Sequence, residues 1–451
     1  MNITLDQPSP TDGLIKITVN ESDYLPRVEK KVKEYSQKMN IKGFRQGKVP
    51  SGVVRKMFGK SILVEEVNHL LSHSVSDYIR EKKLNVLGDP IPNQEKARDI
   101  DWDTQKEFEF EFQVGLVEDF AVDISSNVKV KSHPIEVDQK VMDETIENVR
   151  RQFGDITYPE VSGEGDNLFG EVTDANGEKK SSYIQIQKIN KAEQSKFIGV
   201  KKEDELTFDV KSISDDPLVI SQAINIPEEE AANATGTYTL KVNNISHVEL
   251  SAINQDLFDK TFGKDAVNGE EEFMAKIKET ISENYKRESD HLLEHEIQHY
   301  LVDNTKVNMP ESFLKTWLKL SGDGKITDEV IGKEFDEYKN GLKWDLIRNK
   351  IAEQYKVTVE GPEVKDRAKQ LIAQQFGGPA IAEQLGDKFD GIADNYLSGQ
   401  DGKGENFMRL YNQIRNEKIM KAIRENITVS EKPVSLDEFK KLAAEHAHHA
   451  H

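Results

Sequence analysis

The sequence of 451 residues contains no cysteine, which excludes disulfide bonds and every metal site that depends on thiolate ligands. It also lacks any apolar run approaching the length of about 18 residues that a membrane-spanning helix needs. Its first residues show neither the basic nor the apolar region of a secretory leader. Hydrophobic residues make up 36% of the chain and aromatic residues 8%, with a mean hydropathy of −0.66. We therefore expect a soluble cytoplasmic protein with thin cores and no membrane contact.

Positive charge is outnumbered by negative charge overall but is concentrated in one place. The chain has 61 Lys and Arg against 81 Asp and Glu, a net charge of −20. Residues 27–60 nevertheless contain eleven basic side chains and only two acidic ones, Glu29 and Glu34. A short basic segment on an acidic protein suits a polyanionic partner bound at that segment, because phosphate neutralisation and counterion release act where the basic residues lie.

Within this basic segment, residues 43–50 read GFRQGKVP. Two glycines bracket an aromatic residue and an arginine, while Pro50 fixes its own φ and restricts the residue before it. The pattern predicts a stiff loop that presents Phe44, Arg45 and Lys48 outward. Such a loop loses little entropy when it binds a partner. An ordinary solvated turn is the alternative for a motif this short, but the surrounding basic residues favour docking.

The same string, followed by Val53, Val54 and the pair Phe58-Gly59, resembles the ribosome-binding signature of the bacterial trigger factor family. Members of this family are chaperones at the exit tunnel of the ribosome. The resemblance extends to the segments 13–19, 83–90 and 108–114, and it covers nearly the whole chain except for a poorly matching middle third.

The resemblance implies two partners: the ribosome, through an exit-tunnel protein and ribosomal RNA, and unfolded or nascent polypeptides. A homodimer of the free protein is left open, and no cofactor is expected. It also implies ribosome-binding residues within the loop, namely Gly43, Phe44, Arg45, Gly47, Lys48 and Pro50. A supporting basic patch would consist of Lys38, Lys42, Arg55 and Lys56.

The pattern of elements predicts an elongated α+β multidomain protein. Residues 1–115 form an α+β ribosome-binding domain with the docking loop between two helices, and residues 116–153 form a linker arm that includes a helix capped by Asp138. Residues 154–249 should form a small β-rich domain, which the family resemblance implies is similar to the FKBP isomerases. Residues 250–451 form an open, all-helical chaperone body, since helical-period segments there are separated by Gly and Pro breaks.

Peptidyl-prolyl isomerase activity is the alternative function, because trigger factors carry an FKBP-like domain in this position. The family's aromatic-acidic element should follow the hairpin at Gly177, but residues 179–183 read KKSSY, and the pocket helix is reduced to residues 196–200. A prolyl slot needs apolar walls to enclose its substrate. We therefore expect no catalytic residues in this domain, and interpret it as a spacer or an accessory client-binding domain.

Two histidine-rich segments suggest metal binding. His295-Glu296-Ile297-Gln298-His299 is a literal H-E-x-x-H, the helical motif of zinc peptidases. No third ligand follows at a suitable spacing, so we interpret it as a chance match, with His291, Glu294 and His295 on the polar side of a surface helix. The tail 445–451 could bind a transition metal weakly, but an unstructured terminus is the simpler reading.

Unfolded clients would contact exposed apolar residues of the helical body, because burial of apolar area is non-directional. Most helical-period apolar residues belong to cores, so the sequence alone does not separate client-facing positions from core positions. The candidates are Phe313, Trp317, Leu318, Trp344, Phe376, Tyr396, Phe407, Met408 and Tyr411.

Overall fold

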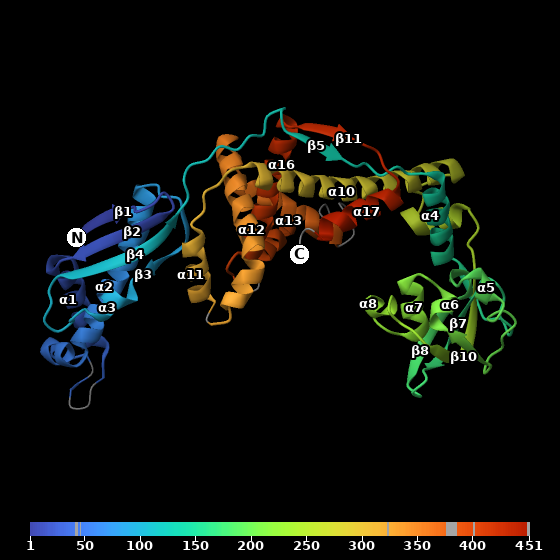
Figure 1. The fold of residues 1–451 in the computed structure, drawn as a ribbon, viewed down its shortest axis with the longest axis horizontal. Helices are drawn as coiled ribbons and strands as arrows, with labels where there is room; N and C mark the ends of the chain where they lie inside the picture. Colours follow the sequence, from blue (N-terminus) through green and yellow to red (C-terminus); the bar gives the residue numbers. More distant parts are fainter. Residues whose placement is uncertain (41–43, 46, 323, 376–385, 400–401, 449–451) are drawn as a thin grey trace. The chain divides into compact units, whose positions relative to one another are not determined.

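The computed structural model describes residues 1–451 except for 41–43, 46, 323, 376–385, 400–401 and 449–451. The described residues divide into two compact units (Figure 1). Unit 1 contains residues 1–132, 291–432 and 442–451, and unit 2 contains residues 133–290 and 433–441. Helices and strands are both abundant, which confirms an α+β multidomain fold. Among the described residues, no helix is long and apolar enough to cross a membrane.

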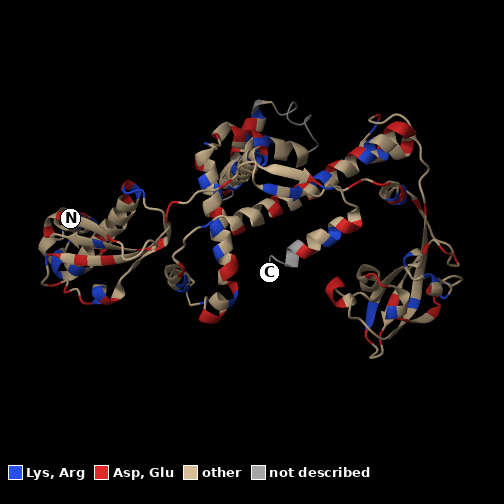
Figure 2. Ribbon diagram, turned by 45° about the horizontal axis from the view of Figure 1, so that its top comes forward, with Lys and Arg blue, Asp and Glu red and all other residues tan. Residues whose placement is uncertain are grey.

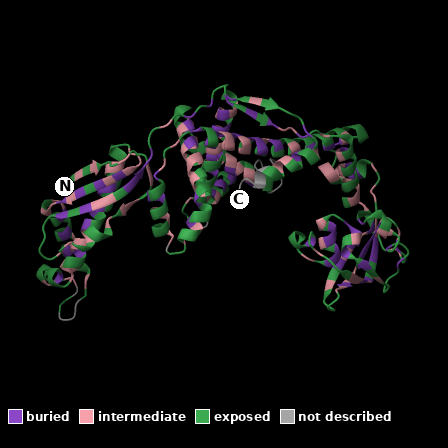
Figure 3. Ribbon diagram, viewed as in Figure 1, coloured by how far each residue is buried: buried purple, intermediate pink, exposed green. Residues whose placement is uncertain are grey.

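Unit 1 begins with a four-stranded antiparallel sheet in the order β1-β2-β4-β3. Its strands are β1 (Asn2–Asp6), β2 (Asp12–Val19), β3 (Val86–Pro92) and β4 (Phe108–Leu116), and its helices are α1 (Glu21–Lys38), α2 (Ser51–Glu81) and α3 (Gln94–Arg98). Alternate residues of β2 (Ile15, Ile17 and Val19) are buried (Figure 3) and share a core with Val32 and Val67. One face of the sheet therefore packs on α1 and α2, as the period-two burial requires.

Helices α1 and α2 both begin at residues that suit a helix start. α1 begins after Asn20, whose main-chain N–H donates to Asp23 Oδ2 at 2.9 Å, so an acidic side chain satisfies a group at the helix start. α2 begins after Pro50, which has a φ of −61° and occupies the N-cap. The sequence predicted two helices, one on either side of the loop. The predicted position of the loop, between two helices, is confirmed by α1 and α2.

The rest of unit 1 is mainly helical. Its helices are α11 (Glu311–Ser321), α12 (Asp328–Gln354), α13 (Gly361–Gln375), α15 (Asp387–Ser398), α16 (Glu405–Asn426) and the second part of α10 (Glu270–Asn304). Lys and Arg alternate with Asp and Glu along these helices (Figure 2), and some of them pair across helices, as Arg367 does with Glu417 at 2.7 Å. The core includes Ile347, Ile351 and Ile419.

Two features of this helical part were not predicted. A short strand, β11 (Thr428–Glu431), pairs in parallel with β5 (Lys129–Ser132), so that Val429 lies opposite Val130. In addition, α11 packs on β3 and β4: a Cβ added at Gly115 would overlap the ring of Phe313, and one at Gly88 would lie 3.0 Å from the Trp317 ring. These two glycines allow a close approach that a side chain would block.

Unit 2 contains a five-stranded antiparallel sheet in the order β6-β10-β7-β8, with β9 paired to β10. Its strands are β6 (Asp155–Thr157), β7 (Asp166–Thr173), β8 (Lys179–Gln185), β9 (Glu205–Asp209) and β10 (Thr237–Glu249). Its other elements are α4 (Gln139–Gln152), η1 (Ile186–Lys188), α5 (Lys191–Gln194), α6 (Val210–Ile213), α7 (Pro217–Ile224), α8 (Glu228–Ala231), α9 (Gln255–Phe262), the first part of α10 and the first part of α17 (Leu436–His448). The predicted cap of α4 is confirmed, since the Asp138 carboxylate accepts from the N–H of Val141 at 2.8 Å.

Candidate functional site

The loop between α1 and α2 has a fixed base. The side chain of Val49 is 2% exposed and belongs to the core of the N-terminal sheet and helices. The Ser36 hydroxyl, in the last turn of α1, donates to the carbonyl oxygen of Val49. On the other side, the N–H groups of Val53 and Val54 donate to the Pro50 carbonyl at 2.9 and 3.2 Å. The C-terminal end of the loop is therefore tied to α1 and to the first turn of α2.

A turn closes the loop just before this base. The N–H of Lys48 donates to the carbonyl of Arg45 at 2.9 Å, and Gly47 has a φ of +76°. A positive φ at the third position of such a turn is costly for any residue with a Cβ. A Cβ at Gly47 would also lie 3.1 Å from the main-chain oxygen of Gln37. The second glycine of the motif is thus required by the backbone, as the sequence predicted.

The side chains that the motif was predicted to present are exposed. Phe44 is 38% exposed, a high value for an aromatic residue, and Arg45 and Lys48 are also exposed. Neither cation forms an ion pair with any residue of the described ranges. An exposed ring beside two uncompensated cations can insert into an apolar depression while the cations bind carboxylate or phosphate groups. Gly43, also predicted to contribute, lies outside the described residues.

Only some residues of the predicted supporting patch have a positive charge that is not balanced by an ion pair. Lys38 and Lys56 are exposed and have no ion pair within the described part of the chain. Arg55 lies 3.6 Å from Glu29, so part of its charge is already balanced. Lys42 falls outside the described residues. Of the residues predicted for the loop and the supporting patch, Lys38, Arg45, Lys48 and Lys56 therefore keep a positive charge that is available to a partner.

The positive charge of Lys31, in the same basic segment, is balanced by two carboxylates. Its ammonium group lies 3.1 Å from Glu65 and 3.5 Å from Glu66, on the neighbouring helix. The hydrogen bond to Glu65 raises the pKa of Lys31 above its ordinary value. This lysine joins α1 to α2, so the eleven basic residues overstate the charge offered to a partner.

Ser36 and Val49 were not singled out from the sequence as part of the site. Val49 is the only apolar residue among the last four of the motif, and its position between Lys48 and Pro50 could have indicated a buried anchor. Ser36 carries no such signal, because a serine in the last turn of a polar helix is usually solvated.

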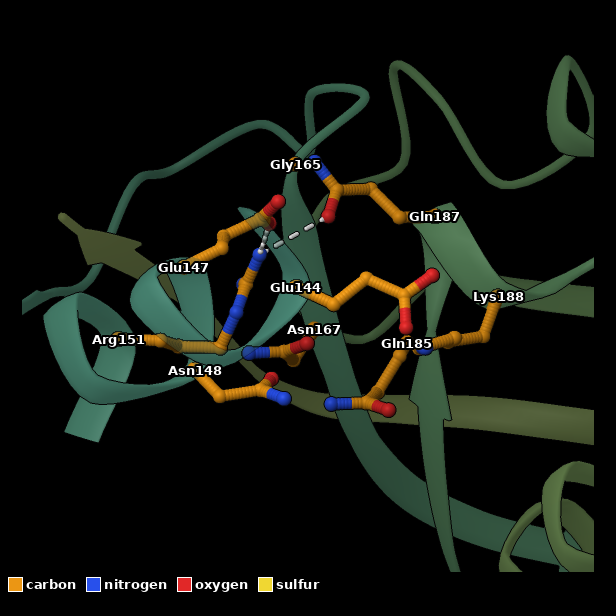
Figure 4. A pocket seen from close by; sticks show the side chains of 9 residues that line it. All are labelled: Glu144, Glu147, Asn148, Arg151, Gly165, Asn167, Gln185, Gln187 and Lys188. Atoms are coloured by element: carbon orange, nitrogen blue, oxygen red, sulfur yellow. Dashed lines mark hydrogen bonds and ion pairs between the residues drawn. The ribbon is translucent and has the colours of Figure 1, made fainter. Parts of the chain in front are cut away.

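A concave site, separate from the loop, lies in unit 2 between α4 and the ends of β7 and β8 (Figure 4). Its volume is about 410 Å³. The lining residues are Glu144, Glu147, Asn148, Arg151, Gly165, Asn167, Gln185, Gln187 and Lys188. Arg151 donates to Glu147 at 2.8 Å and to Gln187 at 3.2 Å. These charged and amide groups form no apolar enclosure, so the site does not have the character of a prolyl slot.

Residues 196–200, which the sequence suggested are a reduced pocket helix, contribute a side chain to the core of the same unit. Phe197 is fully buried, 5.8 Å from the ring of Phe208, while Ile198 beside it is 42% exposed. Gly177 has a φ of +84° in the turn between β7 and β8, as the hairpin prediction required. The aromatic residue retained in residues 196–200 is therefore a core residue.

The H-E-x-x-H segment lies on α10, with the rings of His295 and His299 5.3 Å apart. His291 and Glu294 are exposed as predicted, whereas His295 is half-buried. Within the described residues, no group of three or more His, Asp or Glu side chains is arranged to hold a metal ion. The last three residues of the histidine-rich tail lie outside the described residues.

The predicted client-facing residues differ in exposure. Met408 is 52% exposed. Phe313 has no exposed surface and is one of the candidates that belong to the core: its ring packs against Gly115. Phe376 lies outside the described residues. The remaining candidates are half-buried: Trp317, Leu318, Trp344, Tyr396, Phe407 and Tyr411.

Comparison with known proteins shows one family along the chain. Residues 1–149 match the model described as bacterial trigger factor protein, residues 156–250 match the FKBP-like domain of probable trigger factors, and residues 289–443 match their C-terminal domain. The trigger factor of Pelagibacter ubique is 24% identical over all of this chain and 91% of its own length. That of Salinibacter ruber is 21% identical over 84% of this chain and 85% of its own. A solved structure of a trigger factor chaperone, reported for promiscuous substrate recognition in folding and assembly, is 17% identical with a TM-score of 0.46, over 94% of this chain and 100% of that one.

Proposed function

Because the chain belongs to the trigger factor family of chaperones, we propose that it docks at the ribosomal exit tunnel through the loop at residues 43–50 and shields nascent chains there. The observation that carries this proposal is the exposure of Phe44, Arg45 and Lys48 on a loop whose base is buried at Val49. A rigid base limits the entropy lost on binding, so a few side chains can supply the affinity.

Each exposed side chain has a distinct role in this proposal. Arg45 pairs with a carboxylate of the ribosomal protein at the tunnel rim, which its planar guanidinium can bind through two hydrogen bonds. Phe44 inserts beside that pair and excludes water. Lys48, with Lys38 and Lys56, contacts phosphates of ribosomal RNA. Gly43 and Lys42 belong to the same proposed surface by their positions in the motif.

Client binding in this proposal belongs mainly to the helical residues beyond 250. Met408 and the half-buried aromatic residues Tyr396, Phe407 and Tyr411 offer apolar area to unfolded chains without sequence preference. Nothing in this scheme requires nucleotide hydrolysis, so we propose that the holding of clients is independent of ATP and takes place in the cytoplasm. The segments 1–115, 116–153, 154–249 and 250–451 remain our proposed division of labour.

The FKBP-like segment acts in this scheme as an accessory domain without catalysis. Its concave site is lined by charged and amide groups, and Phe197 is committed to the core. The full-length protein should therefore leave the isomerisation of a proline-containing tetrapeptide at its uncatalysed rate. A rate well above background would establish the alternative, an isomerase with a divergent pocket.

The proposal is tested by co-sedimentation with ribosomes. The variant Phe44→Ala/Arg45→Ala/Lys48→Ala should lose ribosome association while its thermal unfolding is unchanged, because all three side chains are exposed. Lys82→Ala/Arg98→Ala is a matched control, since it removes two exposed basic side chains from the same module. The docking assignment fails if the triple variant sediments with ribosomes as completely as the control.

A further inference from the structure

One asparagine of the unit 2 sheet lines the concave site with a carboxamide that has no partner among the described residues. Asn167, on β7, is 6% exposed, and its carboxamide makes no hydrogen bond to any residue in the described part of the chain. Part of this carboxamide still reaches solvent, so its hydrogen-bonding capacity is open to a ligand. Asn167 lines the concave site of about 410 Å³ described above (Figure 4), so a ligand in that site can reach its carboxamide.

The neighbouring side chains have the same chemistry. Asn167 lies directly opposite Gln185 in the β7–β8 ladder, so both side chains project from one face of the sheet within contact distance. Gln185 donates its amide N–H to the Tyr183 hydroxyl at 3.0 Å, which leaves its carbonyl oxygen available. Asn148, on α4, offers a third carboxamide to the same site (Figure 4) and makes no hydrogen bond within the described residues.

The charged residues of the site balance one another. Glu144 and Glu147 oppose Arg151 and Lys188. The Arg151 guanidinium is already bound to Glu147 and Gln187, and Glu144 lies 3.9 Å from Lys140. A site with no net charge and with open carboxamides selects a neutral ligand that carries both a donor and an acceptor. The peptide group meets this description, since it pairs with a carboxamide through one N–H and one C=O.

We propose that this site binds the main chain of a short, uncharged polypeptide segment through the carboxamides of Asn167, Asn148 and Gln185. Its volume is within the range of about 300–1,000 Å³ that is typical of ligand sites. Recognition of the main chain is independent of sequence and complements apolar holding by the helical residues. This inference rests on the proposed chaperone function, because it assigns one part of the client to a polar subsite.

The test uses the full-length protein and a capped peptide, acetyl-(Gly-Ser)₃-amide, which has no charge and no apolar side chain. Saturation-transfer NMR should detect saturable binding to the wild-type protein. Asn167→Leu should weaken it at least about tenfold, because a desolvated peptide group is left without its partner. Asn148→Ala should weaken it less, since this side chain is exposed. Asn243→Leu, at an exposed position of β10 outside the site, should bind like the wild type.

Capped oligosarcosine separates main-chain recognition from nonspecific adsorption, because its N-methylated backbone has no N–H donors. It should not bind. The inference is overturned if the wild type does not bind the glycine-serine peptide, if Asn167→Leu and Asn148→Ala both bind it as the wild type does, or if oligosarcosine binds equally well. Thermal unfolding of each variant verifies that the fold is kept. Ribosome co-sedimentation and suppression of aggregation by the wild type test the proposed function separately, so the subsite can fail while that function stands.

Discussion

The hydroxyl of Ser36, at the end of α1, donates a hydrogen bond to the main-chain carbonyl of Val49, at the far end of the docking loop. This bond closes the loop at its base, next to the point where the Val49 side chain enters the core. The residues proposed to contact the partner and the residues that hold the loop are therefore different, and substitutions should separate them.

Val49→Ala should destabilise the protein by about 2 kcal/mol, because it removes buried apolar atoms and leaves a small cavity. Ser36→Ala should cost about 1 kcal/mol through the lost hydrogen bond. Both should weaken ribosome binding without changing any exposed side chain of the loop. Chemical denaturation and co-sedimentation measure the two effects. Equal stability of Val49→Ala and wild type would show that the loop base is not anchored as described.

Two glycines in this region should respond in opposite ways to alanine. Gly47→Ala should cost about 1 kcal/mol or more and weaken ribosome binding, because Gly47 has a φ of +76°. Gly52→Ala should be neutral or stabilising by up to about 1 kcal/mol, since Gly52 lies in α2 with no atom within 4 Å of an added Cβ. Gly47→Asn, which tolerates positive φ better, should restore part of the binding. Thermal melts of the three variants decide the matter, and a harmless Gly47→Ala would contradict the turn geometry.

Much of this arrangement was predictable because its signals are local. The period of apolar residues predicted α1, the string of residues 43–50 predicted the loop, and Gly177 predicted the β7–β8 hairpin. The pairing of β11 with β5 was not predicted, because each strand has four residues and some 300 residues of chain separate the partners. The burial of Phe313 depends on Gly115, which lies far away in sequence. Lys31 and Arg55 looked like free cations because their carboxylate partners lie on the neighbouring helix.

Stability at low pH should depend on Glu417. Its carboxylate accepts two hydrogen bonds from Arg367, at 2.8 and 2.7 Å, and these lower the pKa of Glu417 below the ordinary value of 4.5. A lowered folded-state pKa stabilises the protein above the unfolded-state pKa, and this contribution is lost as the pH falls through the folded-state value. Glu417→Gln should therefore lower stability at neutral pH by less than about 1 kcal/mol, since the pair is partly exposed.

The difference between Glu417→Gln and the wild type should shrink as the pH falls below about 4.5. Denaturation curves at a series of pH values measure it. Glu405→Gln, on the same helix and without an ion pair among the described residues, should show no comparable change. A difference that grows on acidification would mean that the pair does not stabilise the α13–α16 contact.

Salt should separate the two proposed tasks. Ribosome binding through Arg45, Lys48 and the patch residues Lys38 and Lys56 should weaken steeply as salt rises, because contacts with phosphate release counterions. Client holding should change little, since apolar burial is not screened. Co-sedimentation and aggregation assays across the same salt series test this. Equal salt sensitivity of both activities would argue against the division.

The most direct measurement of the central claim is site-specific photo-crosslinking to ribosomes from position 44. A photoreactive phenylalanine analogue in place of Phe44 keeps the aromatic ring of an exposed residue. The same analogue at Ile198, also exposed but in unit 2, serves as the control. The account predicts that position 44 crosslinks to a protein at the exit-tunnel rim and that position 198 does not crosslink to the same protein. Absence of a crosslink from position 44, in a protein that still sediments with ribosomes, would contradict docking through this loop.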